Sequence, residues 1–199
     1  MKCSIITMMR NKIEFIFDAN KFKHVSFSDK HLYVVDYTKR TNSVRSVEVH
    51  NTMPTGIDAL FVNNPTKVNI STSIFTPQCF VDTKGKAPKQ CECVMYPTVL
   101  STISWILFIE IKDCKPKNAA NYHREAKEKI LANVQLFRDT KIIDVNKVVH
   151  AIVSFPRKGK TNFHNHLIKT SEWKKIRNDH KIVIKGTNEV TIKNERSIS

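Results

Sequence analysis

The sequence contains one acid and lysine pair in a setting where it could do chemistry. Residues Phe108-Ile109-Glu110-Ile111-Lys112 end an apolar run with the two charged residues two positions apart. In a β-strand, residues two apart project from the same face, so these side chains would stand together on a rigid element. The Glu-x-Lys spacing recurs at residues 125–127 and 172–174, but only the first copy ends a strand-like run. The pair predicts either a hydrolytic site or an ordinary ion pair at a strand end.

A metal-dependent site would need a second acid close to Glu110. Mg²⁺ prefers oxygen ligands, and one or two carboxylates usually hold it in proteins. If strands at 91–96 and 103–111 form an antiparallel hairpin that turns near Ser101, Glu92 lies opposite Glu110. Two facing carboxylates destabilise a sheet unless a cation sits between them. This register predicts a Mg²⁺ site, which Mn²⁺ could also occupy.

Two other acids are alternatives to Glu92 as the first metal ligand. Asp58 lies in the segment Gly56-Ile57-Asp58-Ala59-Leu60, a more favourable context for the first metal ligand than that of Asp82. Asp82 opens the stretch 82–90, which contains Gly and Pro, lacks periodicity and is expected to be an exposed loop. That loop would have to behave as a strand for Asp82 to face Glu110. The order of preference is therefore Glu92, Asp58 and Asp82.

The pattern after residue 90 predicts an α/β core that positions these groups. The apolar stretch 103–111 is typical of a strand that is buried on both faces. A helix is expected from Asn118, because apolar residues recur every three or four positions along one face. This stripe consists of Tyr122, Ala126, Ile130, Val134 and Phe137. With a further apolar strand at 148–155, residues 91–155 should run strand, strand, helix, strand.

Less regular patterns flank this core on both sides. Runs of β-branched and aromatic residues at 13–17, 31–35 and 68–75 predict strands. The tail from Trp173 predicts a short basic helix and then a hairpin with strands at 182–184 and 190–192. We therefore expect a single α/β domain over residues 1–199. Its parts are a β-rich N-terminal part at 1–81, the core at 90–155 and a basic C-terminal extension at 156–199.

Three features of the core together resemble the PD-(D/E)xK nuclease superfamily. They are the segment Lys89-Gln90-Cys91-Glu92-Cys93-Val94-Met95-Tyr96, the strand end Glu110-Ile111-Lys112 and the helix that carries Gln135. The resemblance implies a restriction-endonuclease-like mixed β-sheet flanked by helices, and Mg²⁺-dependent hydrolysis of DNA phosphodiester bonds. It also implies that Glu92 and Glu110 bind the metal and that Lys112 orients the attacking water. Gln135 would contact the substrate or support the site.

The chain departs from that superfamily at the first acid, which is usually Asp, whereas the matching residue is Glu92. The extra methylene displaces the carboxylate, and metal geometry is sensitive to such a shift. Three readings follow: Asp58 is the true ligand, the site accepts Glu, or the chain keeps the fold without catalysis. In the last case it would be a nucleic-acid-binding or assembly component. A basic protein that binds another protein is a further alternative.

The charge of the chain favours a polyanionic partner. Its 33 Lys and Arg outnumber 18 Asp and Glu, which gives a formal net charge of +15. Basic clusters in the second half have the composition of loops and helix faces that meet phosphates, and DNA is the expected partner. The candidate contacts are Lys115, Lys117, Arg157, Lys158, Lys160, Lys174 and Lys175. A solvated, lysine-rich surface is the alternative, and the sequence leaves a homodimer open.

Several classes of protein are excluded by composition. The first ten residues hold too few apolar residues for a secretory signal, and no apolar stretch approaches the roughly 20 residues of a membrane helix. Five cysteines form an odd set without the paired spacing of zinc sites. Reduced thiols in a cytoplasmic protein without a membrane partner are therefore expected.

Overall fold

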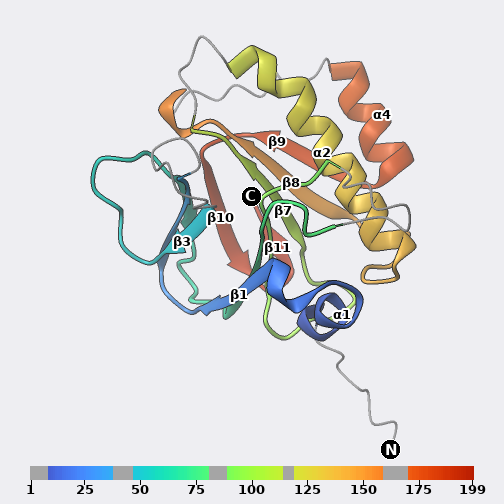
Figure 1. The fold of residues 1–199 in the computed structure, drawn as a ribbon, viewed down its shortest axis with the longest axis horizontal. Helices are drawn as coiled ribbons and strands as arrows, with labels where there is room; N and C mark the ends of the chain where they lie inside the picture. The colour runs from blue at the N-terminus through green and yellow to red at the C-terminus, as the bar shows by residue number, and fades with distance from the viewer. Residues whose placement is uncertain (1–8, 38–46, 81–88, 114–118, 159–169) are drawn as a thin grey trace, which may run out of the picture.

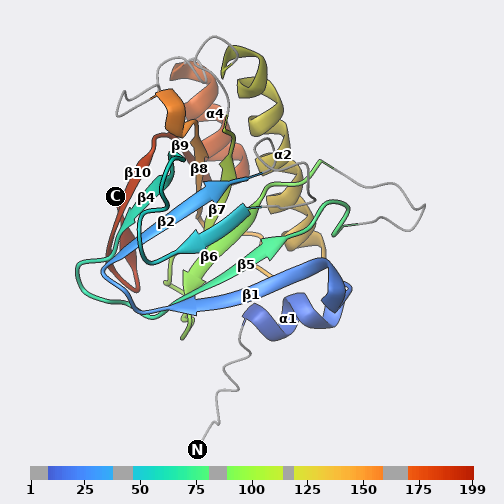
Figure 2. The ribbon, with the colours of Figure 1, turned by 60° about the vertical axis from the view of Figure 1, so that its left-hand side comes forward.

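The computed structural model describes residues 9–37, 47–80, 89–113, 119–158 and 170–199. Four of the candidate site residues lie outside these ranges, namely Asp82, Lys115, Lys117 and Lys160. Most of the loop expected at 82–90 also lies outside them. The described residues form two β-sheets and a layer of helices (Figures 1 and 2).

The first sheet has six strands in the order β1-β5-β6-β7-β8-β9. Their bounds are Phe22–Phe27 (β1), Ile70–Phe75 (β5), Cys93–Pro97 (β6), Leu107–Ile111 (β7), Val149–Ser154 (β8) and Ile182–Gly186 (β9). The pairs from β1 to β7 are antiparallel, whereas β7, β8 and β9 are mutually parallel. Parallel neighbours need a long crossover, and helices follow β7 and β8 for this reason.

The second sheet has five strands in the order β11-β10-β4-β2-β3. Their bounds are His31–Asp36 (β2), Val47–His50 (β3), Leu60–Asn63 (β4), Glu189–Asn194 (β10) and Ser197–Ile198 (β11). Strand β10 runs parallel to β4, and the other pairs are antiparallel. Strands from the first third of the chain therefore meet strands from its C-terminal end in this sheet.

The helices cover one face of the first sheet, and the second sheet covers the other (Figure 2). The α-helices are Met9–Ile16 (α1), Ala119–Asp139 (α2) and Thr170–His180 (α4), and the short 3-10 helices are Ala19–Lys21 (η1) and Pro156–Lys158 (η3). Alternate residues of β7 separate two hydrophobic cores: Phe108 packs against the helices, and Leu107 and Ile109 pack against the second sheet. None of the described helices is both long and apolar enough to cross a membrane.

The α/β class and most elements of the predicted core are confirmed. Strands β6, β7 and β8 lie within the predicted ranges or within one residue of them. Helix α2 begins one residue after Asn118 and buries Ala126, Ile130, Val134 and Phe137 of the predicted stripe. Strands β2 and β5 also match the predicted runs.

Two local predictions are wrong. Residues 13–16 belong to helix α1, because Met9 and Ile13 are four apart and bury the same helix face, while Phe15 is 91% exposed. The expected hairpin after α4 does not form, because β9 joins the first sheet beside β8 and β10 joins the second sheet beside β4. The C-terminal extension therefore completes both sheets.

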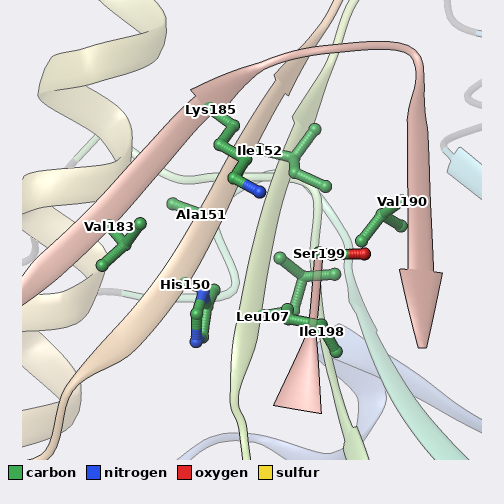
Figure 3. A pocket seen from close by; sticks show the side chains of 9 residues that line it. All are labelled: Leu107, His150, Ala151, Ile152, Val183, Lys185, Val190, Ile198 and Ser199. Atoms are coloured by element: carbon green, nitrogen blue, oxygen red, sulfur yellow. The ribbon is translucent and has the colours of Figure 1, made fainter. Parts of the chain in front are cut away.

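A small cavity of about 10 Å³ lies between the first sheet and strands β10 and β11 (Figure 3). Its walls include Leu107, Ile152 and Val190, together with His150 and Lys185. This volume is about that of one water molecule, which is too small for a substrate. The site that could do chemistry lies elsewhere.

Candidate functional site

Two glutamates meet where β6 begins and β7 ends. Cys93 pairs with Ile109 across the two strands, and the backbone N–H of Glu92 donates to the carbonyl of Ile109 at 3.1 Å. Glu92, directly before β6, therefore lies beside Glu110, as the predicted register requires. Phe108, two residues before Glu110, packs on the helix side of the sheet. Both carboxylates face helix α2.

Helix α2 brings a lysine to these carboxylates. Lys129 Nζ lies 2.7 Å from Glu110 Oε1 and 3.9 Å from Glu92 Oε1. Glu125, one turn earlier on α2, contributes a third carboxylate oxygen 3.8 Å from the same ammonium. Glu110 is only 4% exposed. We call the side chains of Glu92, Glu110 and Lys129 the carboxylate cluster.

A buried asparagine fixes the chain that leads into Glu92. The Asn133 amide donates to the carbonyls of Lys89 at 2.7 Å and Lys129 at 2.8 Å. Its oxygen accepts from the backbone N–H of Cys91 at 3.2 Å. Asn133 is fully buried, so these bonds are shielded from water. They hold the segment before β6 against helix α2.

Burial dominates the protonation behaviour of the cluster. Burial, and then the charge of Glu92, raises the pKa of Glu110 to about 8, although Lys129 acts in the opposite direction. Burial also raises the pKa of Glu92, again opposed by Lys129. Burial alone would lower the pKa of Lys129, but the carboxylates outweigh it and raise that pKa. The cluster therefore favours additional positive charge, from a proton or a cation.

One oxygen of the cluster has no hydrogen-bond partner among the described residues. Glu110 Oε1 meets Lys129, whereas the buried Glu110 Oε2 meets none. Buried polar atoms without partners are costly and rare. In the described ranges, no group of three or more His, Cys, Asp or Glu is arranged to hold a metal ion. A cation here would therefore have two glutamates as protein ligands, which fits the usual coordination of Mg²⁺ with waters and phosphate.

Lys112 leaves the end of β7 on the side of the sheet that carries Glu110. Its backbone N–H donates to the carbonyl of Ser154 on β8 at 3.0 Å. Its Nζ lies 6.0 Å from the centre of the Tyr122 ring, at the start of α2. Its charge opposes the raised pKa of both glutamates. Lys112 is thus near the cluster, while Lys129 makes the direct contact.

The second sheet reaches the site through Asp36, the last residue of β2. Asp36 Oδ2 accepts a hydrogen bond from the backbone N–H of Asp113 at 2.9 Å. Arg157 Nε lies 3.6 Å from Asp113 Oδ1. Both aspartates are almost fully buried, and the charge of Asp36 contributes to the raised pKa of Glu92. These contacts fix the residue that follows Lys112.

The structure does not bring Asp58 or Gln135 to the cluster. Asp58 is exposed, in the loop before β4. Gln135 is exposed on α2, where its amide donates to Asp139 Oδ1 at 2.8 Å. It is six positions after Lys129, so it projects from a different face of the helix.

The described basic candidates are spread over two elements. Arg157, in η3, pairs with Asp113 and lies close to the end of β7. Lys174 and Lys175 are exposed on α4. For Lys158, only the backbone belongs to the described structure. An ion pair between Lys127 and Glu172 joins α4 to α2.

Lys129, Asn133 and Asp36 were not identified from the sequence. Lys129 and Asn133 are four residues apart and each precedes a residue of the buried α2 stripe, Ile130 and Val134. Polar residues at this spacing beside a buried stripe point to an inward-facing edge of a helix. That signal was present in the sequence. The contribution of Asp36 depends on the packing of one sheet on the other, which no local pattern reports.

Comparisons of this chain with known protein families, curated proteins and solved structures give no match. Its function must therefore be inferred from the chemistry of the carboxylate cluster itself.

Proposed function

We propose that this protein is a Mg²⁺-dependent nuclease that hydrolyses DNA phosphodiester bonds at the carboxylate cluster. The observation that carries the proposal is the pairing of the buried Glu110 with the partly buried Glu92, with one buried oxygen of Glu110 unpartnered among the described residues. Folding two like charges together is unfavourable unless the site gains a cation or proton. Such sites are enriched where proteins perform catalysis.

Glu92 and Glu110 would hold the cation in this proposal. Mn²⁺ is an alternative to Mg²⁺, because carboxylate, water and phosphate oxygens suit both ions. When bound, the ion would supply positive charge to the scissile phosphate and lower the pKa of a coordinated water. The glutamates would fix its position from two neighbouring strands.

Two lysines are available to act beside the carboxylates. Lys112 would orient the attacking water and stabilise negative charge on the phosphate. Lys129 already contacts both glutamates and approaches from a rigid helix, so it is a second candidate for that role. The two can be separated by mutation because they come from different elements.

The topology around the cluster supports the resemblance to PD-(D/E)xK nucleases. An acid precedes β6, the Glu-x-Lys pair stands at the end of β7, and helix α2 follows β7 in the chain. The strands belong to a sheet with both parallel and antiparallel pairs. The first sheet carries helices on one face only, since the second sheet covers the other. A restriction-endonuclease-like core is therefore part of the proposal.

One observation favours a second candidate function. Lys129 neutralises part of the charge on both glutamates without a metal. A nuclease-like fold with such an internal cation could serve as a nucleic-acid-binding or assembly component that no longer cleaves. The two candidates differ in turnover and share steep salt dependence of nucleic-acid binding.

A cleavage assay distinguishes these candidates. Supercoiled plasmid, single-stranded DNA and RNA are incubated with the full chain and Mg²⁺, Mn²⁺ or EDTA. We expect DNA cleavage that requires the divalent ion and falls by about 100-fold or more in Glu110→Gln and in Lys112→Ala. The matched lysine control is Lys23→Ala, on the exposed side of edge strand β1.

The control should cleave at the wild-type rate. Cleavage that persists in EDTA, or that survives Glu110→Gln, would overturn the metal mechanism. Absence of cleavage with either ion, together with DNA binding that weakens steeply with salt, would instead support the non-catalytic candidate.

A further inference from the structure

The outer face of the second sheet carries a group of ring side chains. Along β2, Leu32 and Val34 point into the core between the sheets, so His31 and Tyr33 point the other way. On β4, Leu60 and Val62 are in that core, and Phe61 points outward. The helices lie beyond the first sheet, on the opposite side of the molecule (Figure 2).

These rings lie side by side across neighbouring strands. Tyr33 is directly opposite Phe61 on β4 and His50 on β3. The ring centres of Tyr33 and Phe61 are 5.5 Å apart, and those of His31 and Phe61 are 5.4 Å apart. We call His31, Tyr33 and Phe61 the ring platform.

The ring platform remains accessible to solvent. His31 is exposed, and Tyr33 and Phe61 are partly exposed. Farther along β2, the outward-facing Val35 is fully buried, so the open area is the part of the face around these three rings. Clustered rings at the surface mark binding sites more often than isolated ones do.

Exposed basic residues border one end of the platform. Lys30 precedes His31, and its carbonyl accepts from the backbone N–H of Asn64, just beyond β4. Lys193 lies on β10 beside that same turn, since its carbonyl accepts from Thr66 Oγ1 at 3.0 Å. The exposed basic residues at this end are Lys30, Lys67, Lys193 and Arg196, against the acids Asp29 and Glu195. The exposed acid Glu189 of β10 lies directly beside Phe61.

We infer that the ring platform binds single-stranded nucleic acid, with bases stacked on Tyr33, Phe61 and His31 and phosphates beside Lys30 and Lys193. Base stacking on aromatic rings combined with basic side chains along the backbone is the chemistry by which proteins hold single strands. The lysines at this end and the net charge of +15 favour a polyanion over a neutral glycan, and the stacked rings favour one that presents bases.

This surface is separate from the carboxylate cluster. The cluster lies between the first sheet and helix α2. The platform is on the outer side of the second sheet, which covers the opposite face of the first sheet. The inference therefore does not depend on nuclease activity. It adds a binding surface that would hold a strand whether or not the cluster cleaves it.

The test measures binding of a fluorescein-labelled 12-nucleotide oligothymidine by fluorescence anisotropy. All proteins carry Glu110→Gln, so that cleavage does not interfere. Tyr33→Leu and Phe61→Leu remove the rings but keep apolar, strand-compatible side chains. Phe15→Leu is the matched control, because Phe15 is an exposed ring on α1, which packs on the helix side of the first sheet.

We expect each platform variant to bind about tenfold more weakly, in line with the contribution of one stacked base. The control should bind like its parent. Lys193→Ala should reduce the slope of log affinity against log salt, whereas the ring variants should leave that slope unchanged. Circular dichroism melting shows whether each variant is folded.

Unchanged binding in folded Tyr33→Leu and Phe61→Leu would overturn the inference. Equal affinity for duplex and single strand, with no effect of the rings, would also overturn it and indicate simple charge attraction. If the protein with Glu110 intact cleaves DNA while the platform variants bind normally, the proposed nuclease stands and this surface is refuted.

Discussion

Lys129 Nζ lies 2.7 Å from Glu110 Oε1, so a lysine of helix α2 supplies the positive charge opposite the buried carboxyl group at the end of β7. Glu92 adds a second carboxylate oxygen 3.9 Å from the same ammonium. Two acids thus share one lysine in a site with little access to water. A divalent cation would have to compete with the ammonium for this position, which makes Lys129 the residue that separates the two proposed functions.

Lys129→Met should therefore destabilise the fold and increase its response to metal. Above pH 8, where Glu110 is ionised, removing Lys129 leaves the buried carboxylates uncompensated, and we expect a loss of about 3 kcal/mol in the free energy of unfolding. Mg²⁺ should then raise Tm more in the variant than in the wild type, because the ammonium no longer competes. Urea denaturation and thermal melts with and without Mg²⁺ measure both effects.

Lys23→Met is the control for this substitution, since Lys23 is exposed on β1. It should change stability by less than about 0.5 kcal/mol and leave the response to Mg²⁺ unchanged. Wild-type stability in Lys129→Met would show that the ion pair contributes nothing to the fold. An unaltered response to metal would argue against competition at the cluster.

Glu110 should make the stability of the protein depend on pH in a defined direction. Its pKa is about 8 in the folded state, because burial and Glu92 raise it from the usual 4.5. Between these values the folded state holds a proton that the unfolded state has released. The free energy of unfolding should therefore fall as pH rises from about 4.5 to 8, by at most about 1.4 kcal/mol per pH unit.

Glu110→Gln should remove this contribution. The difference in unfolding free energy between the wild type and the variant, measured in urea at several pH values, isolates Glu110 from the other titrating groups. Below pH 4.5 the difference should be constant. A difference that stays flat up to pH 8, or that changes in the opposite direction, would contradict the raised pKa.

The sequence predicted the hairpin and helix of the core because their patterns are long and regular. The turn placed near Ser101 defined the register that puts Glu92 beside Glu110. The short run at 13–17 was misassigned because β-branched residues suggested a strand, whereas packing of Met9 and Ile13 on the first sheet selected a helix. Local propensity is a weak guide where tertiary contacts decide.

The partners of the cluster were harder to predict for a different reason. Glu110 meets a lysine 19 residues later, and the residue after Lys112 meets Asp36, 77 residues before it. These contacts depend on how α2 and the second sheet pack on the first sheet. Burial then determines the protonation behaviour of the glutamates, and burial is a property of the whole fold.

Asp36 should act as a positioning residue for the end of β7. Asp36→Ala leaves the buried backbone N–H of Asp113 without this acceptor, and we expect a loss of about 1–2 kcal/mol in stability. If the cluster is a nuclease site, the cleavage rate should also fall, because Lys112 is adjacent to Asp113. Asp36→Asn retains an acceptor oxygen and should recover part of both losses.

Asp179→Ala, on the exposed surface of α4, is the matched control and should leave stability within about 0.5 kcal/mol of the wild type. A loss of activity in Asp36→Ala that Asp36→Asn fails to reduce would indicate that the charge of Asp36, and not its hydrogen bond, matters.

Asn133 should be the main tether between helix α2 and the segment that carries Glu92. Asn133→Ala removes the acceptor of the Cys91 N–H and the donor to the Lys89 carbonyl, both in a buried setting. Buried groups left without partners cost about 1–3 kcal/mol each, so we expect a stability loss of about 2–3 kcal/mol. Hydrogen exchange at residues 89–92 should accelerate, whereas exchange in β6 itself should not, because the tether is local. Asn178→Ala, exposed on α4, should change neither quantity. Uniform acceleration across the first sheet would mean that Asn133 supports global stability instead of holding Glu92 in place.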